Sequence, residues 1–180
     1  MKSNESNGLK MAICILASLA AMPCRAFAQG DHGWQQSRAR YSQASICGDY
    51  SAIATYGANI ARALGTESFD GKGKLTGSAI ANQPGPNSTR SLTNIGLDGT
   101  YSVNRDGTGK MALTITLPSG ATANVTEDFV ITKIKVIDGV AIATEIEDAQ
   151  EVPSAVIDDT SLVTHSYTLR SAPKSCTSRP

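Results

Sequence analysis

Apolar and polar residues alternate with a period of two along most of the chain beyond its first 45 residues. In the clearest run, Met111, Leu113, Ile115 and Leu117 fall on one face of an extended segment, with smaller or polar residues between them. This alternation is typical of half-buried β-strands, and it recurs between short segments rich in turn residues. The sequence therefore predicts strands over residues 50–60, 63–69, 74–82, 91–104, 111–117, 122–137, 140–146 and 162–169.

Three Asp-Gly pairs separate neighbouring strands of this series: Asp70-Gly71, Asp106-Gly107 and Asp138-Gly139. Glycine reaches positive φ without a Cβ clash and Asp tolerates the left-handed region, so the pair closes a tight hairpin. These turns predict that the strands before and after them pair antiparallel.

Eight antiparallel strands in hairpin order can close on themselves and remove both sheet edges. We therefore expect an all-β fold, a single antiparallel eight-stranded closed barrel. A two-sheet β-sandwich is the alternative. The interior of an eight-stranded barrel is wide enough for side chains or for one small ligand.

The first 28 residues have the pattern of a secretory signal peptide. Lys2 and Lys10 precede an apolar run over residues 11–22, and Ala26-Phe27-Ala28 fits a cleavage site. Cleavage near Ala28 would leave a soluble chain in the periplasm or outside the cell; an uncleaved membrane anchor is the alternative. We expect a flexible segment over 29–46, the barrel domain over 47–176 and a tail over 177–180.

Export also decides how the cysteines are interpreted. Cys14 and Cys24 leave with the signal peptide, while Cys47 precedes the first strand and Cys176 follows the last. Two thiols in an oxidising compartment are expected to pair, and a Cys47–Cys176 disulfide would join the two ends of the barrel.

Charge and composition exclude some partners. The chain has 16 Lys and Arg and 16 Asp and Glu; removal of residues 1–28 takes away three basic residues and one acidic residue, which leaves 13 and 15, a net charge of −2. Without a basic run, nucleic-acid binding is disfavoured. No cofactor is expected, and the oligomeric state cannot be deduced.

No metal site is expected either. There is no Cys-x-x-Cys motif, and His32 and His165 are distant in sequence from both remaining thiols. An acidic run, formed by Glu145, Glu147, Asp148 and Glu151 with Asp158 and Asp159 beyond it, lacks the spacing of a calcium loop. We interpret it as a solvated connection between strands.

Several motifs resemble those of bacterial secreted proteins with an allene oxide cyclase-like barrel, which are lipocalin-like in architecture. The resemblance covers about residues 47–170. It is carried by Cys47, the Tyr56-Gly57 step, the runs 69–77 (FDGKGKLTG) and 99–109 (GTYSVNRDGTG), and 128–131 (DFVI). It implies a barrel fold, with relatives that isomerise or cyclise small apolar substrates, but it assigns no catalytic residue here.

Five side chains are candidates for a site inside such a barrel. Tyr50, Tyr56, Tyr101 and His165 are placed to line a pocket, where their polar atoms would orient a ligand. His165 and Tyr167 are the candidate catalytic pair, because imidazole titrates near neutral pH. Ordinary packing of these side chains at strand positions is the alternative.

Three functions remain open. The first is the binding of a small apolar ligand in the barrel or at its mouth, where ligand sites recur. The second is a cyclase or isomerase, which requires a buried ionisable or hydroxyl group that faces a cavity. The third is a structural or partner-binding barrel with a filled interior, which an exposed apolar patch would favour. Enzymatic activity is less expected than binding.

Overall fold

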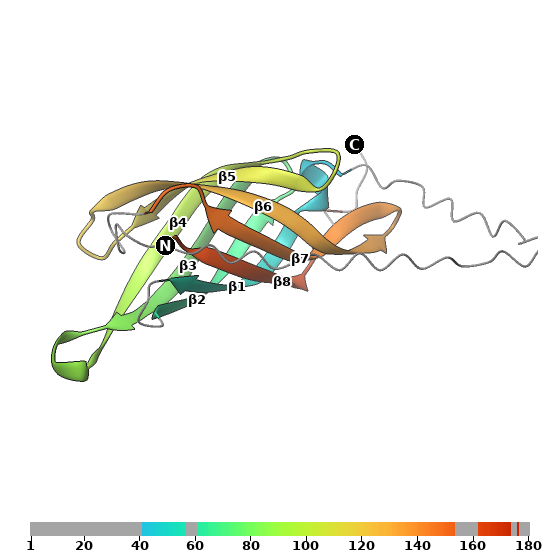
Figure 1. Cartoon of the computed structure of the whole chain (residues 1–180). Helices are drawn as coiled ribbons and strands as arrows, with labels where there is room; N and C mark the ends of the chain where they lie inside the picture. The colour runs from blue at the N-terminus through green and yellow to red at the C-terminus, as the bar shows by residue number, and fades with distance from the viewer. Residues whose placement is uncertain (1–40, 57–60, 154–161, 174–175, 177–180) are drawn as a thin grey trace, which may run out of the picture. The chain divides into compact units, whose positions relative to one another are not determined.

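The computed structural model describes residues 41–56, 61–153, 162–173 and 176 (Figure 1). The proposed signal peptide, residues 29–40 of the lead-in, and the tail over 177–180 lie outside the described residues, as do His32, Asp158 and Asp159. The strands are β1 (Cys47–Tyr56), β2 (Ala61–Asp70), β3 (Lys74–Pro84), β4 (Arg90–Val103), β5 (Thr108–Thr116), β6 (Thr122–Ile137), β7 (Val140–Gln150) and β8 (Thr164–Ser171).

These strands form one closed antiparallel barrel in sequence order. Each strand pairs with the next, and β1 pairs with β8 to complete the cylinder (Figure 1). In this closing pair Ala52 lies opposite Tyr167 and Ala54 opposite His165. The expected barrel is confirmed, and the sandwich alternative is excluded.

The Asp-Gly pairs form the expected turns. Asp138 and Gly139 both have positive φ, 51° and 80°, as a two-residue hairpin with type I′ geometry requires. At the first turn, Asp70 Oδ1 accepts hydrogen bonds from the backbone N–H groups of Lys72 (2.7 Å) and Lys74 (2.9 Å). The side chain therefore holds the loop that glycine allows to bend.

Strands β7 and β6 show features that the alternation did not predict. β7 continues to Gln150 instead of ending at Ile146, because the inward positions Ile146, Asp148 and Gln150 are all buried. In β6 the register shifts between Ile131 and Ile134, so both side chains pack against the core although they differ in parity. An extra residue of this kind is a β-bulge.

Aromatic side chains fill one half of the barrel. Phe69 lies at the centre and makes edge-on contacts with Tyr50 and Tyr101, with ring centroids 5.3 Å apart in each pair. Met111, Leu113 and Phe129 complete this packing. These side chains form the packed core of the barrel.

Residues before the first strand close that end. A short 3₁₀ helix, η1 (Gln43–Ser45), leads to Ile46, which is fully buried against the aromatic core. The Tyr101 hydroxyl donates to the Ile46 carbonyl at 2.7 Å. Packed structure therefore starts before the boundary expected at residue 47, because an apolar plug must cover the end of the core.

The expected disulfide is present between Cys47 and Cys176, with Cα atoms 5.7 Å apart. It joins the start of β1 to the segment after β8, and Ile142 packs beside it. Among the described residues, no helix is long and apolar enough to span a membrane.

Reduction of this disulfide should lower the stability of the barrel. It closes a loop with a sequence separation of 129, and a cross-link of that length is worth about 4–5 kcal/mol in the chain-entropy model. Chemical denaturation of the Cys47→Ser/Cys176→Ser variant measures the loss. An unfolding free energy equal to that of the oxidised protein would contradict the expectation.

Gly109 should not tolerate a side chain. A Cβ there would lie 2.2 Å from Phe129 Cζ and 2.1 Å from the Ser102 carbonyl oxygen, and both belong to the packed half. Gly109→Ala is expected to cost about 1–3 kcal/mol through overpacking. Gly96→Ala in β4 is the matched control, because its Cβ would meet nothing nearer than Thr116 Cβ at 3.9 Å. Thermal unfolding of the two variants gives the comparison, and equal losses would be the contrary result.

Candidate functional site

The half of the barrel opposite the aromatic core contains a cavity. Small side chains on β1, β2 and β3 create it, because Ala54, Ala63, Gly65, Ala79 and Ala81 face inward where bulkier residues would fill the space. Its volume is about 60 Å³. One water takes up about 30 Å³ in the liquid, so the cavity is large enough for a few waters or one small molecule.

Aliphatic side chains line most of the remaining wall. Ile95 and Leu97 come from β4, Leu113 and Ile115 from β5, and Val163 from the segment before β8. The ionisable part of the lining is Glu67, Glu127 and His165, and its other polar groups are Tyr56, Gln83, Thr93 and Gln150. An apolar chamber with a few polar groups is the usual composition of a small-molecule site.

A layer of ionisable side chains separates the cavity from the aromatic core. We call Glu67, Glu127, Asp148, His165 and Tyr167 the polar layer. Glu67 comes from β2, Glu127 from β6, Asp148 from β7, and His165 and Tyr167 from β8. Strand register brings the last three together, because Asp148 pairs directly with His165, and Tyr167 follows two positions later on the same face.

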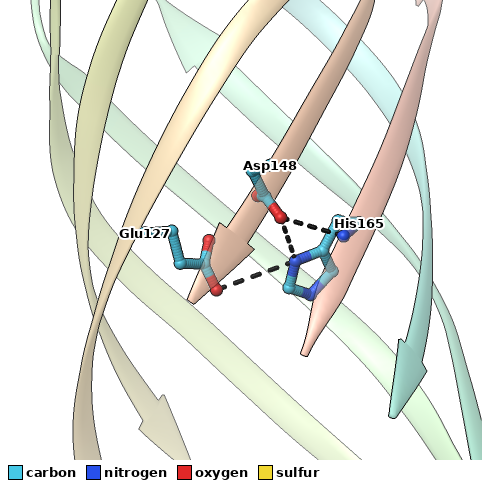
Figure 2. A group of neighbouring side chains, drawn as sticks. All are labelled: Glu127, Asp148 and His165. Carbon is cyan, nitrogen blue, oxygen red and sulfur yellow. Dashed lines mark hydrogen bonds and ion pairs between the residues drawn. The ribbon is translucent and has the colours of Figure 1, made fainter. Parts of the chain in front are cut away.

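Asp148 is the centre of this layer. Its side chain is 0% exposed and accepts three hydrogen bonds: from His165 Nδ1 (2.7 Å), from the His165 backbone N–H (2.9 Å) and from the Tyr167 hydroxyl (2.8 Å). Glu127 Oε1 lies 3.7 Å from the same imidazole nitrogen. Figure 2 shows the two carboxyl groups and the imidazole ring turned toward one another across three neighbouring strands.

The surroundings shift the titration of His165 upward. Burial alone would lower the pKa of this imidazole, but its hydrogen bond to Asp148 and the nearby carboxyl groups of Asp148, Glu127 and Glu67 outweigh that effect. They raise the pKa of His165 to about 9, so the ring is cationic at neutral pH.

The pKa values of Glu67 and Glu127 are raised, whereas those of most carboxyl groups in proteins are lowered. Burial raises the pKa of Glu67 to about 7; the charge of His165 opposes the rise and that of Asp148 adds to it. Burial also raises the pKa of Glu127 well above its ordinary value, with the same opposition from His165 and further contributions from Asp148 and Glu67. Three carboxyl groups thus share one imidazolium, and two of them resist ionisation.

Three buried polar atoms have no hydrogen-bond partner among the described residues: Glu67 Oε2, Glu127 Oε2 and the Tyr56 hydroxyl oxygen. All three belong to residues that line the cavity. A buried polar atom without a partner costs about 1–3 kcal/mol, and native proteins satisfy nearly all such atoms. The residues with buried polar atoms that lack a partner are therefore grouped around this cavity.

The structure places the sequence-predicted site residues in three locations. Tyr56 and His165 line the cavity, as a pocket role requires. Tyr50 and Tyr101 are packed in the aromatic core, and their hydroxyls donate to the carbonyls of Ala143 (2.8 Å) and Ile46 (2.7 Å). Tyr167 belongs to the polar layer, where its hydroxyl donates a hydrogen bond to Asp148 Oδ2.

Sequence reasoning missed Glu67, Glu127 and Asp148. The interpretation of the acidic run as a solvated connection is wrong for Asp148, which points inward on β7 while its neighbour Glu147 is exposed. Strand parity carried the missing signal. Glu67 shares a face with Phe69, and Glu127 with Phe129.

The polar layer also contains a set of donors that suit a metal ion. One ligand atom each from Glu127, Asp148 and His165 lies within 4.8 Å of the other two. Glu127 and His165 face the cavity as well, so an ion bound there would be open to the cavity on one side.

Glu67 should make the barrel less stable as pH rises. A carboxyl whose pKa is about 7 when folded and about 4.5 when unfolded contributes stability below pH 4.5, and loses it as pH rises through 7. Glu67→Gln, which stays neutral, is expected to match the wild type at pH 4 and to exceed it by roughly 3 kcal/mol at pH 8. Denaturant unfolding at both pH values, in buffer with a chelator, measures the difference. A variant no more stable than the wild type at pH 8 would rule out this burial effect.

In comparisons with known proteins, no protein-family model, no curated protein and no solved structure matches this chain. The resemblance to allene oxide cyclase-like barrels remains a prediction from turn and strand-end motifs. What the site can do follows from its own geometry.

Proposed function

We propose that this protein binds a small, mainly apolar molecule inside the barrel. One observation carries the proposal: Tyr56, Glu67 and Glu127, which each have a buried polar atom without a partner among the described residues, all line the same apolar cavity. A ligand with an apolar body would fill the chamber, and a polar group at one end of it would approach Glu67 and Glu127. Tyr56 pairs with Ala61, six residues before Glu67 on β2, so it lies toward the other end of the ligand. Such pairing of shape with a few fixed polar groups is how small-molecule sites gain orientation.

The polar end of the ligand is best a hydroxyl group. A protonated carboxyl donates one hydrogen bond, whereas a carboxylate only accepts, and a hydroxyl can serve either form. The Tyr56 hydroxyl can also donate or accept. An alcohol therefore fits the lining whether Glu67 carries its proton or not.

The volume limits the size of the ligand. The cavity volume of about 60 Å³ is smaller than the cavity of about 150 Å³ that binds benzene in an engineered protein. The ligand is therefore expected to be no larger than a single ring. Benzyl alcohol is the upper size limit for a first probe.

The other two expected functions, an isomerase and a partner-binding barrel, would use the cavity and the outer face respectively. The buried groups that an isomerase requires do face the cavity, so the identity of the bound molecule has to be found before any turnover can be assayed. On the outer face, Ile53, Leu64 and Ile80 are cross-strand neighbours and exposed. That row is the kind of apolar patch that a partner-binding barrel would use.

A large side chain inside the cavity should weaken ligand binding. Ala81→Phe places a ring inside the chamber and is expected to weaken binding of benzyl alcohol at least ~10-fold, a loss of about 1.4 kcal/mol or more. Ile80→Phe adds bulk to the outer face of the same strand and should leave binding unchanged. Ligand-observed NMR gives the affinities, and organic extraction of the purified wild type identifies any molecule already bound.

Two results would count against the proposal. The first is an absence of saturable binding of benzyl alcohol, toluene and their single-ring relatives to the wild type. The second is equal binding of benzyl alcohol to Ala81→Phe and Ile80→Phe, because binding would then lie outside the cavity. A cooperative thermal unfolding transition verifies that each variant is folded.

A further inference from the structure

Three neighbouring strands each direct one metal-ligating side chain to a common point in the interior. These are Glu127 on β6, Asp148 on β7 and His165 on β8 (Figure 2). Pairing of Phe129 with Asp148, and of Asp148 with His165, fixes the positions of all three along the barrel. The convergence therefore comes from strand register and does not depend on a loop.

The spacing of these donors is close to that of a coordination sphere. His165 Nδ1 lies 2.7 Å from Asp148 Oδ1 and 3.7 Å from Glu127 Oε1. Bonds of about 2.1 Å in tetrahedral geometry place the donors about 3.4 Å apart. The two observed separations bracket that value, so shifts of well under 1 Å would be enough to admit an ion.

A second observation points to a ligand at this place. The Glu127 side chain is 1% exposed, and its Oε2 has no hydrogen-bond partner among the described residues. Burial of a carboxyl oxygen without a partner is costly, and a metal ion satisfies such an oxygen directly. Glu127 also contributes to the lining of the cavity.

Support for the ligands is already in place. The Tyr167 hydroxyl donates to Asp148 Oδ2 at 2.8 Å, on the oxygen that faces away from His165. Metal-binding proteins hold their ligating carboxylates with outer hydrogen bonds of this kind. Asp148 Oδ1 is thereby kept on the side of the imidazole.

We propose that Glu127, Asp148 and His165 bind one divalent first-row transition-metal ion, with Zn²⁺ as its closest match. One imidazole and two carboxylates are ligands that Zn²⁺ and Mn²⁺ accept, whereas Ca²⁺ takes six to eight oxygens. A divalent cation would also offset the excess of carboxyl groups in the polar layer. This revises the expectation from sequence that no metal site is present.

Three protein ligands leave one coordination position open. Because Glu127 and His165 line the cavity and the aromatic core lies behind the polar layer, that position faces the cavity. Metal sites with three protein ligands and one open position bind water or an exogenous oxygen. The inference does not depend on the proposed organic ligand, because the metal alone can be tested.

Calorimetric titration of the purified, chelator-treated chain with ZnCl₂ and MnCl₂ tests the site. The wild type should bind one ion per chain. Glu127→Gln, Asp148→Asn and His165→Gln should each weaken binding by ~10- to 100-fold or more, since even outer-shell changes have effects of that size. Glu147→Gln, next to Asp148 but exposed on the outer face, and His32→Gln should bind as the wild type does.

A measurement on the wild type alone guards against variants that fail to fold. Addition of Zn²⁺ should shift the ¹⁵N resonance of His165 Nδ1, and an anomalous-scattering map of a Zn²⁺ soak should show one peak among the three donors. The proposal is overturned if the wild type shows no saturable binding. It is equally overturned if Glu127→Gln/His165→Gln binds as well as the wild type, or if the anomalous peak lies elsewhere.

Discussion

Pairing of β1 with β8 is the interaction on which the rest of this structure depends. It closes the sheet, so that inward side chains from strands distant in sequence face one enclosed space. Glu67 on β2 then shares an interior with Asp148 and His165, far along the chain. Because Ala52 and Ala54 lie opposite Tyr167 and His165, the closing pair also leaves room for the two larger side chains. The disulfide joins the start of β1 to the segment after β8, beside this pair.

The packed aromatic core and the cavity lie in different halves of the same interior. Aromatic side chains at one end are packed edge to face, and Ile46 covers them. Alanine and glycine at the other end leave space that costs packing energy. The exposure of apolar walls to that space is tolerable because the filled half, the backbone ladder and the disulfide hold the barrel together. Glu67→Gln and Gly109→Ala probe these two halves separately.

Period-2 alternation and Asp-Gly turns were sufficient to predict the architecture, because both report local backbone geometry that hairpins require. They also placed His165 and Tyr56 on an inward face. They did not reveal Asp148, because four acidic residues within seven positions suggest solvent exposure, and only the extension of β7 to Gln150 turns Asp148 inward. Glu67 and Glu127 had the parity of buried neighbours, but the location of a carboxyl relative to an imidazole two strands away depends on closure and register. Sequence periodicity contains no information on that distance.

The polar layer is hard to explain as a device for stability alone. Burial of a carboxyl group in an apolar interior raises its free energy, and isosteric apolar replacements of buried charged groups are often neutral or stabilising. His165 and Tyr167 compensate Asp148 well, yet Glu67 and Glu127 each retain an oxygen without a partner. Both glutamates also contribute to the lining of the cavity. Strongly perturbed titratable groups beside a cavity are a common property of functional sites. The combination of unsatisfied carboxyl groups, a neighbouring imidazolium and an adjacent chamber is therefore better explained by a bound partner than by packing.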